Sequence, residues 1–468
     1  MEGSAHPYFR LLPVKPAEEA LEGERSVSDG EAKPVWERFA DTVKVLTYNV
    51  LAEIYCSQAL GTGSPAHALW PYRAGLLQQQ LELLNPDIIC LQEVDHFRDF
   101  FWPMLLRKGY DGAFLPRTGG KRDGCATFWK KSKWQLVRKV ELFLNDVAKY
   151  EGVASIRSRT DNVALGVVLI PSPCVPSSRK EKTGEEEEQE EQEIKEGEGL
   201  LVVNTHLYWD PRKEDVKLLQ LHHIVKSIED ILHGRKKNRG RGGVNLCSAL
   251  GTRSESSKVI LCGDFNSLPG SVVYNYATRG RLEEEEWGPV LLPHLSSVPS
   301  STSTDSSSSS SSSSSSLDSS PSSPPPSSSL SSPRTAQNRK KNKNKRRSLH
   351  FEHELNFRSG YDNYYSGARP EVEMNEVHRR QKEEQTENEQ QQLPQEPLFT
   401  NYTANFKGTL DYIFYTERTL EVVARLCLPP VSLLEREGVK DLPCPFLPSD
   451  HLPLLCCFSS APWASSCN

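Results

Sequence analysis

The segment VKVLTYNVLA (Val43–Ala52) is a run of apolar and β-branched residues, a pattern that predicts a buried β-strand. A second buried strand is predicted at DIICLQEV (Asp87–Val94), after a stretch of helical periodicity near 73–84. Each run ends near a polar residue that an apolar core does not select, Asn49 in the first and Glu93 in the second. The ends of buried strands are therefore where functional side chains are expected.

The same kind of segment recurs along the chain. Further strands are predicted at 125–130, 134–143, 162–170, 200–209, 259–265 and 409–415, with a helix at 218–232. Many apolar strands with intervening helices predict an α/β fold, a two-sheet α/β sandwich with helices on its outer faces.

Composition limits the class of protein. The net charge of −6 argues against bulk electrostatic binding of nucleic acid and leaves only a local basic channel. The 11 cysteines have no metal-binding spacing, which indicates reduced thiols inside the cell. No stretch approaches the roughly 20 apolar residues of a membrane span, and the amino terminus has no secretory signal pattern. We therefore expect a cytoplasmic protein without membrane association, and a nuclear location is also compatible with the sequence.

Biased composition divides the chain. Residues 1–40 are predicted to be a flexible amino-terminal arm, and 41–295 with 396–460 a single catalytic domain. Three segments have too few apolar side chains to form a core and are predicted to be disordered low-complexity insertions. They are 179–199, 234–257 and 297–395.

The third insertion has two distinct parts. Its basic cluster RKKNKNKRR (Arg339–Arg347) is either a solvated charged stretch or a nuclear address or RNA tether. Its segment LHFEHELNFRSGY (Leu349–Tyr361) has apolar residues at near-helical spacing and could be ordered.

Polar residues follow several later strands as well. His206 ends one strand, Asp264 and Asn266 lie in CGDFNS, and Asp411 and the pair Asp450-His451 come late in the chain. Phosphodiester hydrolysis requires such residues, because carboxylates bind a hard metal ion and a histidine oriented by a carboxylate transfers protons near neutral pH. Each short motif alone is more often an ordinary turn or loop residue. Their order and their placement at strand ends make coincidence a poor explanation.

The ordered motifs TYN, LQEV, NTH, GDFNS, LDYIFY and SDH resemble the exonuclease–endonuclease–phosphatase superfamily. Longer strings, such as NTHLYWDPRKEDVKLLQ and NYTANFKGTLDYIFY, are similar to the group of carbon-catabolite-repressor-type deadenylases, nocturnin and the angel proteins. The resemblance covers about 41–295 and 396–458, and it implies a DNase I-like fold.

The resemblance also implies roles for individual residues. Mg²⁺ would be held mainly by Glu93, with Asp264 and Asp450 near it. Asp411 would pair with His451, although the sequence leaves open whether Asp411 or Asp450 is the closer partner. The full set of implied catalytic residues is Asn49, Glu93, His206, Asp264, Asn266, Asp411, Asp450 and His451.

The substrate implied by the resemblance is the 3′ end of RNA, in particular poly(A). In the deadenylase group a terminal adenine lies between a proline and a phenylalanine, which correspond here to Pro211 and Phe406. Ordinary loop packing is the alternative for these two residues. The implied activity is that of a Mg²⁺-dependent 3′–5′ exoribonuclease.

Three alternatives stay open. The string RTGGKRDGCA resembles the angel proteins, which act on RNA 2′,3′-cyclic phosphate ends, and nocturnin removes the 2′-phosphate of NADP(H). A catalytically silent RNA-binding scaffold is the third, and the intact motif set argues against it. The sequence contains no leucine-rich repeats, so docking on a deadenylase complex through such repeats is not expected.

Overall fold

The computed structural model describes most of the segments that were predicted to be ordered. The described residues are 10–13, 42–60, 65–149, 160–173, 198–234, 249–250, 256–295, 350–364 and 396–460. The predicted insertions at 179–199, 234–257 and 297–395 fall for the most part outside these ranges, as does most of the predicted arm at 1–40.

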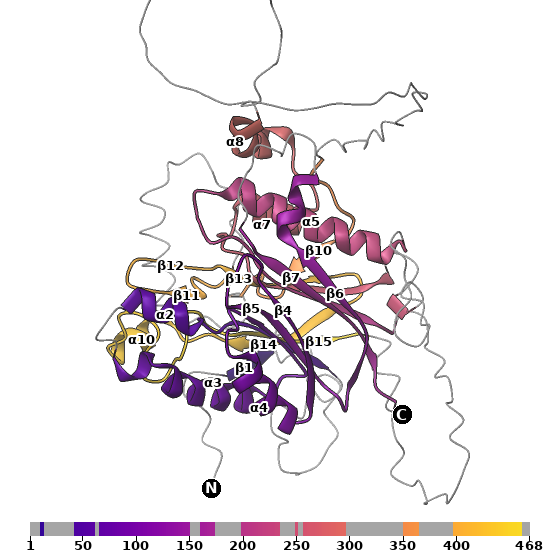
Figure 1. The fold of residues 1–468 in the computed structure, drawn as a ribbon. Helices are drawn as coiled ribbons and strands as arrows, with labels where there is room; N and C mark the ends of the chain where they lie inside the picture. Colours follow the sequence, from indigo (N-terminus) through magenta and orange to yellow (C-terminus); the bar gives the residue numbers. More distant parts are fainter. Residues whose placement is uncertain are drawn as a thin grey trace, which may run out of the picture.

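Two mixed β-sheets form the centre of the molecule (Figure 1). One has seven strands, in the order β1 (Arg10–Pro13), β14 (Glu421–Cys427), β15 (Leu454–Ser459), β2 (Val43–Asn49), β3 (Ile88–Gln92), β5 (Gly124–Lys130) and β4 (Tyr110–Pro116). The other has six, in the order β10 (Phe357–Ser359), β13 (Asp411–Thr416), β9 (Lys258–Asp264), β8 (Leu200–His206), β7 (Val163–Pro171) and β6 (Trp134–Phe143). Strands β11 (Asn401–Tyr402) and β12 (Lys407–Gly408) form a small separate pair.

Helices cover the outer faces of the two sheets, with α5 and α7 on one side and α3 and α4 on the other (Figure 1). The helical segments are α2 (Glu53–Leu60), α3 (Trp70–Leu84), α4 (Trp102–Arg107), α5 (Glu214–Leu232), α7 (Val272–Arg279), α8 (Glu284–Leu295), α10 (Val431–Arg436) and the short turns Ala66–Ala68, Phe97–Phe101 and Leu144–Lys149. The predicted α/β sandwich with outer helices is therefore confirmed.

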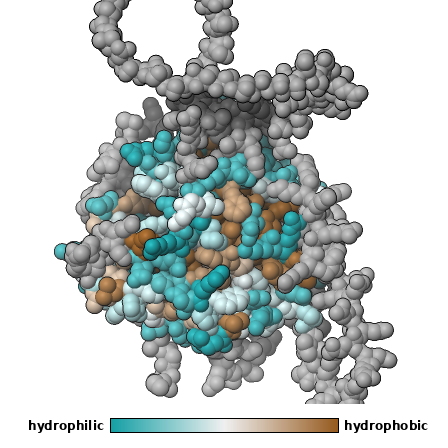
Figure 2. Space-filling model, in the orientation of Figure 1, coloured by the Kyte–Doolittle hydropathy of each residue, from teal (hydrophilic) through white to brown (hydrophobic). Residues whose placement is uncertain are grey.

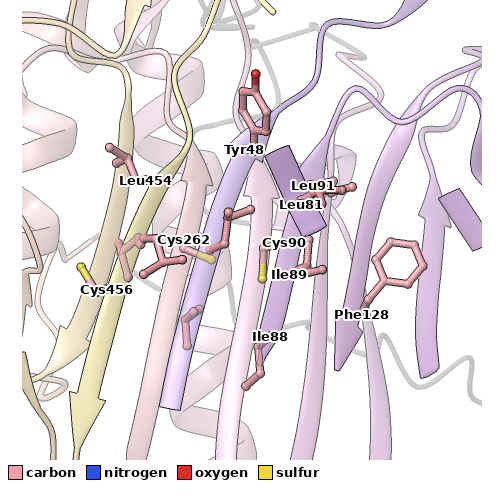
Figure 3. Packing of buried hydrophobic residues seen from close by; sticks show 14 of the residues in the cluster. Tyr48, Leu81, Ile88, Ile89, Cys90, Leu91, Phe128, Cys262, Leu454 and Cys456 are labelled. Carbon is pink, nitrogen blue, oxygen red and sulfur yellow. The ribbon is translucent and has the colours of Figure 1, made fainter. Parts of the chain in front are cut away.

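Two apolar clusters hold these layers together. One lies between the sheets and extends to α3, and it includes Cys90 of β3 and Cys262 of β9. Figure 3 shows part of this cluster, with Ile88 and Cys90 among the buried side chains of β3. The other cluster joins α5 and α7 to the outer face of the six-stranded sheet. Burial of this much apolar surface is the main favourable contribution to folding.

Polar residues replace apolar ones at one end of the inter-sheet space. On β8, Leu200 and Val202 belong to the inter-sheet cluster, and Asn204 and His206 follow on the same face because strand side chains alternate. The amide of Asn204 donates to the backbone of the facing sheet at Leu91 and Ala126. This end of the sandwich is therefore polar while the rest of the same face is apolar.

Two parallel strand pairs bring functional residues to that end. Strand β2 runs parallel to β3, and β8 runs parallel to β9, so the carboxyl ends of each pair lie side by side. Gly263 makes the second pair possible, because its φ is +141° and a Cβ there would lie 1.8 Å from the Thr205 carbonyl oxygen. A larger residue at Gly263 would separate the ends of β8 and β9.

Two segments differ from the sequence predictions. Arg10–Pro13, within the predicted flexible arm, form an edge strand that pairs with β14, where Pro13 is tolerated because an edge strand leaves one side unpaired. Residues 350–364 lie within the predicted third insertion and include most of the segment that could be ordered; the structure describes them, with 350–359 extended and not helical and 360–364 in a turn. Phe351, His353, Leu355 and Phe357 are buried there and the residues between them are exposed, so the true periodicity is two, not that of a helix.

None of the helices that the structure describes is long and apolar enough to cross a membrane. On the face shown in Figure 2, hydrophobic side chains lie among hydrophilic ones. Apolar atoms make up much of any folded surface, so scattered patches of this kind carry no functional argument.

Candidate active site

Strand ends from both sheets meet at the polar end of the sandwich. In the six-stranded sheet, Asp264 at the end of β9 is the register partner of both His206 on β8 and Asp411 on β13. From the other sheet, Asn49 ends β2 and Glu93 directly follows β3. Together with His451, these residues form what we call the floor: Asn49, Glu93, His206, Asp264, Asp411 and His451.

The amide of Asn49 links the two sheets at the floor. Its Nδ2 donates to Glu93 Oε1 and to Asp264 Oδ2, each at 3.0 Å, and its Oδ1 accepts from the Leu51 backbone N–H at 3.1 Å. Glu93 adopts a left-handed backbone with φ of 57°, an unusual conformation for a residue with a long side chain. Such backbone strain is concentrated at functional sites.

A buried arginine supports Glu93 indirectly, through the backbone that follows β2. Arg73 of α3 is fully buried, and its guanidinium donates to the carbonyl oxygens of Val50 and Leu51. The Leu51 carbonyl belongs to the same peptide group as the Ala52 N–H, which donates to Glu93 Oε2 at 3.0 Å. The charge of Arg73 thus polarises the peptide that holds the Glu93 carboxylate.

His451 is paired with Asp411. Its Nδ1 lies 2.7 Å from Asp411 Oδ2, which also accepts from the Thr400 hydroxyl at 2.6 Å. The sequence had left the partner of His451 open between Asp411 and Asp450, and the geometry favours Asp411. Asp450 instead accepts from Asn401 Nδ2 at 3.2 Å, and it lines the same cavity.

The GDFN turn is fixed by a buried lysine. Asn266 has a left-handed φ of 48°, its N–H donates to Asp264 Oδ1 at 2.9 Å, and its side-chain amide donates to the Leu207 carbonyl. Lys217 of α5 is 2% exposed and donates to the Asn266 carbonyl at 2.6 Å. The turn is therefore held on both sides, which fixes the carboxylate of Asp264.

The pKa values of several floor residues are shifted in different directions. Burial raises the pKa of the Glu93 carboxyl to about 8, and the neighbouring charge of Asp450 acts in the same direction. Burial also raises the pKa of Asp264. For His451, burial favours the neutral ring, but the charges of Asp411, Asp450 and Asp264 outweigh it, and its pKa lies well above the ordinary value. Burial lowers the pKa of His206.

This donor set fits a hard divalent cation. Glu93 and Asp264 converge on one amide, and Asp264, Asp411 and His451 offer ligand atoms within 4.8 Å of one another. Burial raises the pKa of Glu93 and of Asp264, and a nearby cation would stabilise the charged forms of these two carboxylates. The compact group contains Asp411 and His451, whereas the predicted set was Glu93, Asp264 and Asp450, so only Asp264 is common to both.

The floor opens into a cavity of about 670 Å³. Both predicted substrate-binding residues, Pro211 and Phe406, line it. With Trp209 they form what we call the rim: Trp209, Pro211 and Phe406. Trp209 is 62% exposed and Phe406 is 38% exposed.

Several residues at the cavity were not predicted from the sequence. They are Tyr55, Arg117, Lys121, Thr160, Asn162, Tyr208, Trp209, Asn401 and Leu410. Arg117 and Lys121 lie in the basic string RTGGKRDG, and that charge was the available signal for them. Arg117 is held by the carboxylate of Asp123 at 3.5 Å and by the carbonyl oxygen of Thr160 at 2.9 Å.

Carboxylates and histidines gathered at one end of two mixed sheets suit the metal-assisted hydrolysis of a phosphate ester. The sequence profile of the endonuclease/exonuclease/phosphatase family matches residues 46–451, and the chain belongs to this family. The resemblance predicted from the motifs is therefore confirmed.

Curated relatives fall in the carbon-catabolite-repressor group. The chain is 30% identical over 286 residues to the "CCR4-Not complex 3'-5'-exoribonuclease subunit Ccr4" of Candida albicans, which covers 57% of this chain and 32% of that protein. It is 29% identical over 449 residues to "Carbon catabolite repressor protein 4 homolog 1" of Arabidopsis thaliana, which covers 90% of this chain and 58% of that protein. The chain thus spans about a third to three fifths of the length of these relatives.

Among solved structures, the fold is similar to that of ANGEL2, described as a 2′,3′-cyclic phosphatase, in complex with adenosine-2′,3′-vanadate. The TM-score is 0.54 at 22% identity, and the match covers 90% of this chain and 96% of that chain. At this identity the likeness supports the DNase I-like fold, and it does not bear on the substrate.

Proposed function

We propose that this protein is a Mg²⁺-dependent 3′–5′ exoribonuclease that removes adenylates from the 3′ end of RNA. The observation that carries the proposal is that Glu93, Asp264 and His451 line one cavity, where Asn49 holds the two carboxylates and Asp411 holds the histidine. The Candida albicans relative, named as a 3′–5′ exoribonuclease subunit, supports the reaction class. The proposed substrate is supported by Pro211 and Phe406, which line the same cavity.

In this proposal Glu93, Asp264 and Asp450 would hold the metal ion. When bound, Mg²⁺ would neutralise the negative charge that develops on the phosphoryl group. The Asn49 amide keeps the Glu93 and Asp264 carboxylates oriented.

The protein's own groups supply positioning and proton transfer. Asp264 accepts a proton from the attacking water, and the Asn266 turn keeps its carboxylate in place. The bond between phosphorus and the 3′ oxygen of the neighbouring nucleotide breaks, and His451, held at Nδ1 by Asp411, gives its Nε2 proton to that leaving oxygen as the general acid. His206, whose ring is neutral because burial lowers its pKa, donates a further hydrogen bond to the phosphate.

The terminal adenine would lie between the ring of Pro211 and the face of Phe406. Both lie on loops at the cavity opening, and an aromatic face stacks on a base without reading its edge. Stacking alone therefore favours a large base such as adenine without excluding others.

The test is a substrate panel run with Mg²⁺ and with EDTA. End-labelled RNAs of equal length ending in A, U or C are incubated beside NADP⁺ and an RNA with a 2′,3′-cyclic phosphate end. The proposal predicts stepwise shortening with release of 5′-AMP, fastest for RNA ending in A and abolished by EDTA. Turnover of NADP⁺ or of the cyclic phosphate without shortening would replace it with a phosphatase function, and inactivity on all substrates would favour a scaffold.

A further inference from the structure

Trp209 is unusual among the aromatic residues that the structure describes. It is 62% exposed, whereas most of the large aromatic side chains are buried in the two clusters, and it lies at the cavity. Leaving an indole in water forgoes the burial of a large apolar surface. An exposed tryptophan at the opening of a cavity is therefore a candidate binding surface.

The loop around Trp209 is fixed by specific contacts. On one side, the Tyr208 N–H donates to Gln220 Oε1 of α5 at 2.9 Å. On the other, Asp210 accepts from the backbone N–H and the guanidinium of Arg212 at 2.9–3.0 Å. These hydrogen bonds hold the backbone on both sides of Trp209 in a conformation that leaves the ring exposed. A backbone fixed in this way does not have to be ordered when a ligand binds, so only the side-chain rotation of the indole is lost.

The indole is not stacked on another aromatic ring in the part of the chain that the structure describes. Its aromatic neighbour there is Tyr208, whose ring centroid lies 6.0 Å away at 56°, so the two rings are tilted and not stacked. The proposed site for the terminal base uses Pro211 and Phe406, which leaves Trp209 without a role in it. Two cationic side chains, Arg117 and Lys121, line the same cavity and suit the phosphates of a longer chain.

We propose that Trp209 is the stacking platform for the second base of the substrate, the base next to the terminal nucleotide. The inference rests on the proposed exoribonuclease function and deepens it, because it makes single-stranded RNA of at least two bases the preferred substrate class. Stacking on an indole is tolerant of base identity, so Trp209 would recognise that a second base is present but not which base it is.

The test uses the full-length protein and two RNAs that differ at one position. One is an oligoadenylate, and the other has the same length and phosphates but an abasic ribose at the penultimate position. The wild-type protein is expected to lose roughly 5- to 150-fold in kcat/KM on the abasic RNA, the range for losing one stacked base. Trp209→Ala should lose a similar factor on oligoadenylate and no further activity on the abasic RNA, while Trp209→Phe should retain most of it.

The matched control is Leu83→Ala, which removes another exposed apolar side chain, 50% exposed on α3 and outside the cavity lining. This variant should match the wild type on both RNAs. The inference is overturned if Trp209→Ala cleaves oligoadenylate as fast as the wild type, or loses as much on the abasic RNA as on the intact one. If the wild type shortens neither RNA, the proposed function itself fails, which is a different result.

Discussion

The floor and the rim of the cavity are built in opposite ways. Asn49, Asp264 and Asp411 on the floor are each 1% exposed, and they are held by hydrogen bonds between Asn49 and Asp264 across the two sheets and between Asp411 and Thr400. At the rim, Trp209 and Phe406 are 62% and 38% exposed and lie on loops. The floor is fixed by the same strand register that forms the core, whereas the rim can change without disturbing it.

This difference separates two kinds of function. A floor embedded in the core can orient groups to within fractions of an ångström, which phosphoryl chemistry requires. Loops at the surface tolerate substitution and are where related proteins diverge in what they bind. The reaction class should therefore depend on the floor and the choice of substrate on the rim.

The strongest test of this separation removes Glu93. Glu93→Ala is expected to lower kcat on RNA by about 10³-fold or more, because a metal ligand contributes several kcal/mol to stabilising the transition state. The melting temperature should stay close to the wild-type value, measured by calorimetry beside the kinetics. The control is Glu53→Ala, which removes a carboxylate that contacts His96 outside the cavity lining, and it should keep full activity. Turnover like the wild type in Glu93→Ala would remove this residue from the mechanism.

The second prediction concerns the Asp411–His451 pair. Each single alanine variant should lose about 10²- to 10⁴-fold in kcat, the range for general acid–base catalysis. The kcat of the double variant should be only slightly lower than that of the less active single variant, because the 2.7 Å hydrogen bond makes the two residues act as one unit. Asp450→Ala is the comparison: its loss should be partly restored by raising Mg²⁺, and that of Asp411→Ala should not. Fully multiplicative losses, with metal rescue of Asp411→Ala, would reverse the roles of the two aspartates.

The sequence predicted the floor better than the elements that support it. Asn49, Glu93, Asp264 and Asp411 each follow or begin a recognisable apolar strand, so short motifs identified them. Neither the lateral alignment of Asp264 with Asp411 nor the contact of Arg73 with the Leu51 peptide could be predicted. Both arise from packing between segments that are distant in sequence.

A weak local pattern explains one of the missed elements, whereas the signal for two others was present in the sequence. Strand β4, YDGAFLP, contains a glycine and ends in proline, which are both unfavourable in strands. Strand β14, EVVARLC, alternates and was detectable in principle. The alternation of Phe351, His353, Leu355 and Phe357 was present in the sequence too, but the near-helical spacing of other residues obscured it.

The third prediction tests how the floor is supported. Arg73→Met keeps much of the volume of the side chain but removes the charge that polarises the Leu51–Ala52 peptide. We expect activity at fixed Mg²⁺ to fall by about 10- to 100-fold, the usual effect of losing a residue that orients a metal ligand. Part of the loss should be restored at higher Mg²⁺, which a purely structural defect would not show. Arg73→Lys keeps the charge and should retain more activity than Arg73→Met. Equal losses of activity in both variants would contradict the idea that the charge of Arg73 acts on Glu93 through the Leu51–Ala52 peptide.

The fourth prediction addresses the rim. Phe406→Ala should raise KM for RNA ending in A by roughly 5- to 150-fold, the range for one aromatic–base stack, and should change kcat little. Phe406→Tyr should preserve the stack and most of the affinity. The preference for A over U at the 3′ end should narrow in the alanine variant, because the larger base gains more from stacking. A fall in kcat as large as that of the floor variants would show that floor and rim are not separable.

The smallest effect on kcat and on the melting temperature is expected from deleting a segment that belongs to neither the floor nor the rim. Deleting residues 300–345, which are rich in serine, proline and basic residues, should leave kcat on short RNA unchanged. The melting temperature should stay within about 5 °C of the wild type, shifted upward if at all, because a shorter loop costs less entropy to close. The matched control is a deletion of 300–364, which also removes the buried Phe351 and Leu355 and strand β10. That control should be strongly destabilised, since each large buried side chain contributes about 2–5 kcal/mol. Equal melting temperatures for the two deletions would mean that residues 350–364 contribute nothing to the core, and a folding defect in the shorter deletion would make 300–345 part of the folded domain.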